Sequence, residues 1–391
     1  MESFYRTHRY LVEHVNTRVH RQLMREINWD DRLIGIKGSR GVGKTTFLLE
    51  YAKQKFGTDR RCLYINLNHF YFTENRLVDF ATRFYRQGGR TLLIDQVFKD
   101  PDWSKDLRSI YDTLPELQVV FTGSSVMRLK EENPDLSGIV QSYNLRGFSF
   151  REYLNLMTGS DFPEYSLDEV LTDHASIAAG ILQKINPFDY FKDYLHHGFY
   201  PFFLENRNFS ENLLKTMNMM IEVDILLIKQ IDLAYLTKIR KLLYILGQNA
   251  PCAPNISQLS NDVSISRATV MNYIKYLKDA RLIDLLYPVG EQFPKKPSKV
   301  YLHSTNLMYV LQETVDHQTN CETFFYNTVH KDNKVNRGPK AAQFILNGNQ
   351  TFQISAGQTR LRNNPIQWQV VDNLEVGKDK VIPLWLFGFL Y

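Results

Sequence analysis

The sequence predicts an α/β protein whose first domain is a parallel β-sheet covered by helices on both faces. A glycine-rich segment, Gly38 to Thr46, follows the apolar run Leu33 to Ile36 and precedes a stretch with helical spacing. Further short apolar runs alternate with helical stretches such as Leu77 to Gln87. Continuous apolar strands alternating with helices are typical of a parallel sheet buried on both sides.

The glycine-rich segment fills every position of the pattern G-x-x-x-x-G-K-[ST]. Its residues are Gly38, Ser39, Arg40, Gly41, Val42, Gly43, Lys44, Thr45 and Thr46. The glycines let backbone N–H groups curl around phosphates, Lys44 can reach the β and γ oxygens, and the Thr45 hydroxyl can ligate Mg²⁺. The helix that follows adds positive potential at the phosphates. We therefore expect these residues to bind a nucleoside triphosphate.

The other elements of the first domain follow from the same periodicities. Residues 1 to about 30 have helical spacing and lead into the glycine-rich loop. The later strands and helices are predicted at Cys62–Leu67, Leu77–Gln87, Thr91–Asp95, Trp103–Thr113 and Gln118–Gly123. These elements place an α/β nucleotide-binding domain over residues 1–156.

Three more parts are expected after this domain. Residues 157–235 have helical periodicity with few strand signals, which indicates a helical lid. Residues 236–305 hold three helices and two strands, the order of a winged helix-turn-helix, with Ser266 as N-cap of the third helix. Their predicted bounds are Ile239–Leu246, Ile256–Val263, Arg267–Ala280, Leu282–Tyr287 and Val300–Leu302.

Residues 306–391 predict a second α/β domain. A helix is expected around Glu322, and Asn347-Gly348 is a strong hairpin signal between two strands. The predicted strands are Gln343–Leu346, Thr351–Ile354, Gln367–Val371 and Pro383–Phe389.

Composition narrows the classes of protein. The net charge is +5, from 47 Lys plus Arg against 42 Asp plus Glu in 391 residues, which permits nucleic-acid contact without arguing for it. Cys62, Cys252 and Cys321 are too far apart in sequence to predict a disulfide framework or a zinc site. The N-terminal segment lacks the apolar core of a signal peptide, and the apolar C-terminal run is too short to span a bilayer. We therefore expect a cytoplasmic protein without a membrane segment.

Hydrolysis of a nucleotide needs a second acidic group near Mg²⁺ and a group that orients the attacking water. Asp95 ends a strand of the right type and is predicted to act with Thr45 at the metal. The next residue is Gln96, whose neutral amide can hydrogen-bond a water but cannot accept its proton. Because losing a general base commonly costs about 10²- to 10⁴-fold in rate, we predict nucleotide binding with slow or absent turnover.

For other candidate residues the sequence does not determine one role. Ser124 follows a core strand, where a γ-phosphate sensor would lie, although a polar strand-to-helix turn explains the pattern equally well. The candidates for stabilising transition-state charge are Arg128, Arg146 and Arg151, and the sequence does not choose between them. No role is assigned to histidines without the paired spacing of a metal site, namely His69, His174, His196 and His197.

Taken together, these residues resemble AAA+-like ATPases, close to the archaeal ATPase branch of the signal-transducing NTPases, with a C-terminal domain that resembles the PD-(D/E)XK nucleases. The resemblance spans nearly the whole chain. Its segments are Gly38–Thr46, Leu92–Asp95, Val120–Ser125, Leu145–Tyr153 and Ile382–Phe389. It implies an AAA-type domain, a winged helix and a restriction-endonuclease-like domain, with ATP as the nucleotide and Mg²⁺ as its metal.

This sequence departs from the family pattern at catalytic positions. Gln96 stands where glutamate is usual, Phe98 where histidine is usual, and Gly138-Ile139 where an arginine pair is usual. In the nuclease-like part Glu322 remains, but the other family positions hold Gln343, Gln353 and Ser355 in place of two acids and a lysine. Each glutamine removes a negative charge from a site that must hold a dication, so nuclease activity is not expected.

The sequence therefore favours an ATP-binding regulatory or scaffold protein with weak or no hydrolysis. One alternative is a slow ATPase that remodels a partner protein. A second is a nucleic-acid-binding protein that uses basic residues of the winged helix, namely Arg267, Lys275, Lys278, Arg281, Lys295, Lys296 and Lys299. A protein partner is expected but not identified by the sequence, and assembly into a homo-oligomer is left open.

Overall fold

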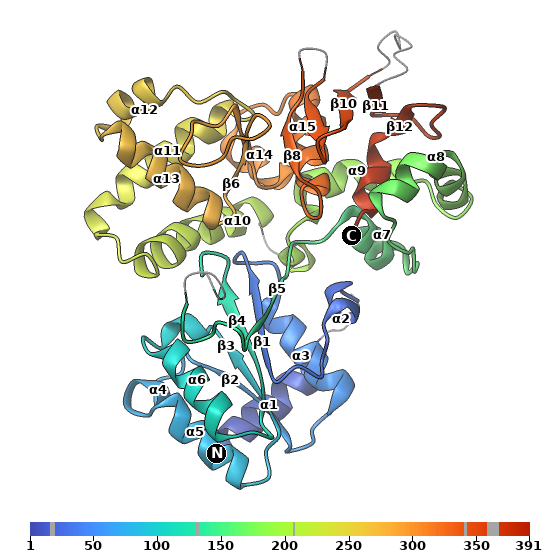
Figure 1. Cartoon of the computed structure of the whole chain (residues 1–391). Helices are drawn as coiled ribbons and strands as arrows, with labels where there is room; N and C mark the ends of the chain where they lie inside the picture. The colour runs from blue at the N-terminus through green and yellow to red at the C-terminus, as the bar shows by residue number, and fades with distance from the viewer. Residues whose placement is uncertain (16–19, 128, 130–132, 206–207, 340–341, 358–366) are drawn as a thin grey trace. The chain divides into compact units, whose positions relative to one another are not determined.

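The computed structural model describes residues 1–15, 20–127, 129, 133–205, 208–339, 342–357 and 367–391. The chain forms two compact units, Met1–Gly147 and Phe148–Tyr391, which we call unit 1 and unit 2 (Figure 1). None of the described helices is both long and apolar enough to cross a membrane.

Unit 1 is built on a parallel sheet with strand order β2-β3-β4-β1-β5. The strands are β1 (Leu33–Gly38), β2 (Cys62–Asn66), β3 (Thr91–Asp95), β4 (Gln118–Ser124) and β5 (Gln141–Asn144). The first four are largely buried, as their apolar runs predict. The edge strand β5 was not predicted, because its sequence Gln-Ser-Tyr-Asn carries no apolar run.

Helices cover both faces of this sheet. They are α1 (Glu2–His14), α2 (Leu23–Glu26), α3 (Lys44–Lys55), α4 (Tyr71–Glu74), α5 (Leu77–Arg86), the 3₁₀ turn η1 (Val97–Lys99) and α6 (Trp103–Thr113). Helices α1 and α3 contact each other, and both contact β2, while α5 and α6 contact each other on the opposite face (Figure 1). This confirms the α/β fold class expected for the first domain.

Unit 2 begins with a helical region. Its elements are α7 (Phe150–Thr158), α8 (Leu167–Leu182), α9 (Phe188–Asp193), η2 (Tyr194–Gly198), η3 (Pro201–Leu204), α10 (Phe209–Met219), η4 (Met220–Leu227) and η5 (Leu233–Tyr235). Ser149 and Ser166 form capping boxes with Glu152 and Glu169 at the starts of α7 and α8. Elements η2 and η4 are π-helices, a change of period that the spacing of apolar residues does not reveal.

Three helices and an antiparallel hairpin follow. They are α11 (Leu236–Asn249), α12 (Ile256–Val263), α13 (Arg267–Asp279), β6 (Ile283–Leu286) and β7 (Lys299–Leu302). The Ser266 side chain accepts a hydrogen bond from the Thr269 N–H, so the expected N-cap of α13 is confirmed. The order and type of these elements match the expectation, and their assignment as a winged helix stays a prediction.

The last part of unit 2 is a mixed sheet with two helices. Its elements are α14 (Thr305–Leu311), α15 (His317–Val329), β8 (Val335–Arg337), β9 (Phe344–Leu346), β10 (Gln350–Ser355), β11 (Gln367–Val371), β12 (Val381–Pro383) and the 3₁₀ helix η6 (Leu384–Phe389). The strand order is β12-β11-β10-β9-β8, antiparallel from β8 to β10 and parallel from β10 to β12. The Asn347-Gly348 hairpin is confirmed, with both residues at positive φ.

The strand predicted over Pro383–Phe389 is wrong. Pairing with β11 ends at Pro383, and the chain then turns into η6. All six residues of η6 are buried, so the segment lacks the apolar–polar alternation that distinguishes a strand from a buried helical turn.

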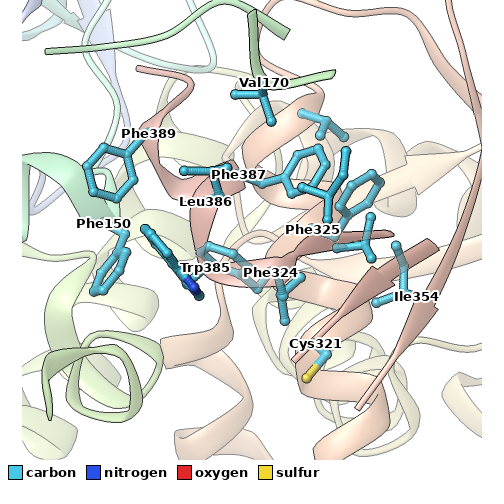
Figure 2. Packing of buried hydrophobic residues seen from close by; sticks show 14 of the residues in the cluster. Phe150, Val170, Cys321, Phe324, Phe325, Ile354, Trp385, Leu386, Phe387 and Phe389 are labelled. Carbon is cyan, nitrogen blue, oxygen red and sulfur yellow. The ribbon is translucent and has the colours of Figure 1, made fainter. Parts of the chain in front are cut away.

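Aromatic side chains join the two ends of unit 2 into one core. Phe150 of α7 packs against Phe389 of η6, with ring centroids 6.2 Å apart, and Phe325 of α15 packs against Phe387 at 4.8 Å (Figure 2). Helix α7, which the sequence placed in the first domain over residues 1–156, therefore packs within unit 2. The division of the remainder into 157–235, 236–305 and 306–391 stays a prediction.

Candidate nucleotide-binding site

The glycine-rich loop connects β1 to α3 as the motif requires. Strand β1 ends at Gly38 and α3 begins at Lys44. Gly41 and Gly43 have φ of 84° and 93°, a left-handed conformation that a side chain would strain. A Cβ on Gly38 would lie 2.4 Å from the Leu145 carbonyl oxygen, so the first glycine also allows the chain after β5 to approach the loop.

Lys44 lies over this loop. Its Nζ donates to the carbonyl oxygens of Gly38 and Ser39, each at 2.8 Å. Ser39 and Val42 are buried, whereas Thr45 and Thr46 at the start of α3 are exposed. Two acceptors of the ammonium group are thus neutral carbonyl oxygens, which are weaker acceptors than phosphate oxygens.

Asp95 is the centre of a hydrogen-bond network at the carboxyl end of β3. Its Oδ2 accepts from the Thr45 hydroxyl at 2.7 Å and from the Tyr64 hydroxyl at 2.9 Å, and its Oδ1 accepts from the Thr122 hydroxyl. Asn66 lies nearby, with Nδ2 3.4 Å from Oδ2. Burial raises the pKa of Tyr64, and the Asp95 charge raises it further, so Tyr64 stays a hydrogen donor. Thr45 and Asp95 are therefore in contact, and their role as a metal-binding pair stays a prediction.

Gln96 is fixed through its backbone. Its N–H donates to Asp95 Oδ1 at 3.1 Å and to the Thr122 hydroxyl at 3.0 Å. Its φ is 57°, a left-handed conformation uncommon for glutamine. The side chain that replaces the usual glutamate therefore starts from a constrained backbone next to Asp95.

Ser124 lies at the same end of the sheet. It is the register partner of Gly38 in the β1–β4 pair, and its side chain is buried. The Val126 N–H lies 3.4 Å from the Ser124 hydroxyl, a contact typical of a turn. The role of Ser124 as a γ-phosphate sensor and its role in a strand-to-helix turn therefore both stay predictions.

Of the three candidate arginines, Arg146 belongs to unit 1 and Arg151 to unit 2. Arg128 lies outside the described residues. Arg151 is buried in unit 2, where its guanidinium donates to the carbonyls of Tyr391 and Phe162 at 3.1 and 3.2 Å. These contacts give Arg151 a structural role at the C-terminal end of the chain.

Arg21 is a residue that the sequence did not single out. Its guanidinium is buried and donates to the Val42 carbonyl of the glycine-rich loop at 3.1 Å. The same group donates to the carbonyls of Arg146 at 2.6 Å and Gly147 at 3.3 Å. Arg21 thus ties the loop to the last residues of unit 1. No motif marks such an arginine, because its partners are backbone atoms distant in sequence.

Comparison with known families now identifies the fold of this site. Residues 30–154 match a family model described as an AAA domain, a range that contains the loop, Asp95, Gln96 and Ser124. Residues 30–154 thus have an AAA+-like fold, and most of them belong to unit 1. Residues 188–317 match a second model, a domain of unknown function (DUF8612), which spans α9 to the start of α15.

Two curated relatives of this chain come from Methanocaldococcus jannaschii. The uncharacterized protein MJ1637 is 30% identical over 280 residues, covering 67% of this chain and 58% of the relative. The uncharacterized protein MJ1544 is 24% identical over 267 residues, covering 64% and 55%. The chain thus spans a little over half the length of these relatives.

Solved structures similar to this chain include a DnaA and a PCH-2. AMPPCP-bound DnaA from Aquifex aeolicus is 15% identical, covers 71% of this chain and 87% of that one, and has a TM-score of 0.25. PCH-2 of C. elegans is 16% identical, covers 71% and 66%, and has a TM-score of 0.22. With scores this low, the family match alone carries the assignment.

The residues expected in a nuclease-like site do not form a carboxylate cluster among the described residues. Glu322 is buried, and its Oε1 accepts from Lys299 Nζ at 2.7 Å and from the Tyr301 hydroxyl. The Gln343 amide pairs with the backbone of Ile354, donating at 3.1 Å and accepting at 3.0 Å. Gln353 is exposed on β10. Glu322 thus belongs to an ion pair within the fold.

Proposed function

We propose that this protein binds Mg·ATP as a regulatory or scaffold protein, hydrolyses it slowly or not at all, and passes its nucleotide state from the loop to the last residues of unit 1, Arg146 and Gly147, which we call the junction. The observation that carries this proposal is the Arg21 guanidinium, which contacts a loop carbonyl and the last two carbonyls of unit 1.

The loop residues fit a triphosphate. Two glycines at positive φ leave the backbone free to curl, and Lys44 is held by carbonyl oxygens that phosphate oxygens can replace with a stronger, charge-assisted bond. The residues expected to contact the nucleotide are Gly38 to Thr46.

The Thr45–Asp95 pair fits Mg²⁺. A hydroxyl and a carboxylate oxygen 2.7 Å apart are hard oxygen donors, which Mg²⁺ prefers. Bound there, Mg²⁺ would neutralise charge on the phosphates. Tyr64 and Thr122 orient the Asp95 carboxylate through hydrogen bonds, and they are positioning residues for the metal.

Slow hydrolysis follows from Gln96. The amide can hold a water by hydrogen bonds but cannot remove its proton. Hydrogen bonds to Asp95 and Thr122 fix the backbone of Gln96, so the chain need not rearrange to keep this side chain near Asp95. A protein that binds ATP and retains it fits a switch better than a motor, because the bound state then lasts.

Transmission to the junction has two contacts in unit 1. Leu145 pairs with the loop strand through its N–H, which donates to the Lys37 carbonyl at 2.7 Å, and Arg21 bridges Val42 to Arg146 and Gly147. A ligand that shifts the loop therefore changes the contacts of the residues that lead into unit 2. Such a device requires ATP to favour one of two arrangements of the junction.

Limited trypsin digestion tests this coupling at Arg146. ATP with Mg²⁺ should change the cleavage rate after Arg146 by at least about 5-fold, the lower end of usual coupling energies. Arg21→Lys keeps the charge but cannot contact all three carbonyls, so it should reduce the ATP effect to about twofold or less while ATP still binds. Arg25→Lys, an exposed position on α2, is the matched control and should behave as wild type. An unchanged cleavage rate with ATP in wild type, or an undiminished ATP effect in Arg21→Lys, contradicts the proposal.

The nucleic-acid alternative has fewer available cations than its sequence suggested. Lys299 forms the ion pair with Glu322, Lys295 Nζ lies 3.5 Å from Glu291, and Lys275 lies over the Phe293 ring. Three of its exposed basic residues are Arg267, Lys278 and Lys296. DNA binding that weakens steeply with salt would favour this alternative.

A further inference from the structure

His317, Cys321 and Asp372 lie together in unit 2, whereas the residues discussed for nucleotide binding belong to unit 1. His317 and Cys321 are four residues apart on α15 and so share one face of that helix, and Asp372 directly follows β11. Each residue offers one possible ligand atom: an imidazole nitrogen, the thiol sulfur or a carboxylate oxygen. These three atoms all lie within 4.8 Å of one another. His317 Nε2 is 2.9 Å from Asp372 Oδ2.

These three groups have the chemistry of a zinc site. A thiolate and an imidazole are ligands that Zn²⁺ takes in preference to Mg²⁺ or Ca²⁺, and a carboxylate completes many such sets. A thiolate and a carboxylate together supply two negative charges, which balance the charge of the ion. Zinc bonds of about 2.0–2.3 Å place neighbouring ligand atoms roughly 3–4 Å apart, so small side-chain shifts suffice.

Asp372 supplies an independent sign of a ligand. Its side chain is 95% buried, and no hydrogen-bond partner for Oδ1 is found among the described residues. Leaving a buried carboxylate oxygen unsatisfied is costly, and an ion is one of the groups that satisfy such an atom. The residue itself is held in place, because its N–H donates to the Ser355 carbonyl at 3.0 Å and Asn373 Nδ2 lies 3.3 Å from Oδ2.

The three side chains differ in exposure. The His317 side chain is 54% exposed, whereas Cys321 is fully buried at the edge of the aromatic core. Figure 2 shows the Cys321 sulfur directed away from the labelled rings of that core. The exposed imidazole is the ligand that solvent can reach, and water can supply a fourth ligand there.

We propose that His317, Cys321 and Asp372 bind one Zn²⁺ ion that links the start of α15 to the end of β11. The wide spacing of the cysteines in the sequence argued against a zinc site, because a spacing pattern can reveal only sites built from several cysteines. Here one cysteine is completed by a histidine one helical turn earlier and by an aspartate from a strand end.

Cobalt titration of the full-length protein tests this site, because Co²⁺ replaces Zn²⁺ and is visible. Protein treated with chelator and kept free of nucleotide should bind one Co²⁺ with thiolate-to-cobalt absorption in the near ultraviolet and strong visible bands of a four-coordinate ion. Zn²⁺ should then displace it. Any Co²⁺ at Thr45 and Asp95 has only oxygen ligands and gives no thiolate band.

Variants separate the site from its surroundings. His317→Ala, at an exposed position, should keep the fold and weaken Co²⁺ binding by more than about 100-fold, beyond the usual cost of losing an outer-shell partner. Cys321→Ser should remove the thiolate band, and Cys252→Ser, at another free cysteine, should retain it. Absence of the band in wild type, or its persistence in His317→Ala at wild-type affinity, overturns the proposal.

Discussion

Replacing Gln96 with glutamate directly tests why turnover should be slow. Glutamine and glutamate have nearly the same size, and the residue-96 backbone is already fixed by its N–H bonds to Asp95 and Thr122. The left-handed φ of 57° applies equally to both side chains. The substitution therefore adds a proton acceptor at an unchanged position.

The expected gain is the usual contribution of a general base. A positioned base gives about 10²- to 10⁴-fold in rate. This corresponds to a barrier lower by roughly 3–5 kcal/mol. Binding of Mg·ATP should weaken slightly, because the new carboxylate lies beside Asp95 and near the negatively charged phosphates.

A single-turnover assay measures both quantities. Protein in excess over labelled Mg·ATP is followed for bound nucleotide and released phosphate together, in wild type, Gln96→Glu and the double variant Lys44→Ala, Gln96→Glu. Wild type should hold ATP with little release, Gln96→Glu should release phosphate, and the double variant should do neither. The reasoning is refuted if wild type releases phosphate within about tenfold of the rate of Gln96→Glu.

Three further predictions concern binding and stability. Lys44→Ala should weaken ATP binding by about 10- to 100-fold in calorimetry, because a charge-assisted bond is lost, whereas Lys55→Ala at the end of the same helix should bind as wild type. Glu322→Ala should lower the free energy of unfolding, measured in urea, by about 2 kcal/mol, because Lys299, which is 37% exposed, loses its carboxylate partner. An unchanged urea midpoint would exclude a structural role for Glu322. Burial lowers the pKa of His8 from 6.5 to about 4. As the pH falls from 6.5 to 4, the histidine therefore takes up a proton in the unfolded chain but not in the folded chain. Unit 1 should therefore lose up to about 3 kcal/mol of stability across that window, and His8→Gln should lose less over the same range.

The local signals in the sequence determined the AAA+-like part of the protein. The order of strand, loop and helix around Lys44 depends on neighbouring residues alone, because glycines, a lysine and a hydroxyl at fixed spacing suffice to cradle phosphates. The pairing of Thr45 with Asp95 could be predicted for a related reason: both lie at the carboxyl edge of a parallel sheet. Hairpin chemistry at Asn347-Gly348 was equally local.

Tertiary structure decided which distant groups meet. Tyr64 and Thr122 join Asp95 from adjacent strands, Arg21 reaches backbone carbonyls beyond β5, and Asp372 approaches the face of α15 that carries Cys321. Neither a propensity nor a spacing predicts these contacts, because each depends on the packing of elements far apart in the chain. The sequence by itself therefore determined that a nucleotide-binding loop forms. Only the fold decided which distant residues contact the loop, because hydrogen bonds to backbone atoms cannot be predicted from the pattern of side chains in the sequence.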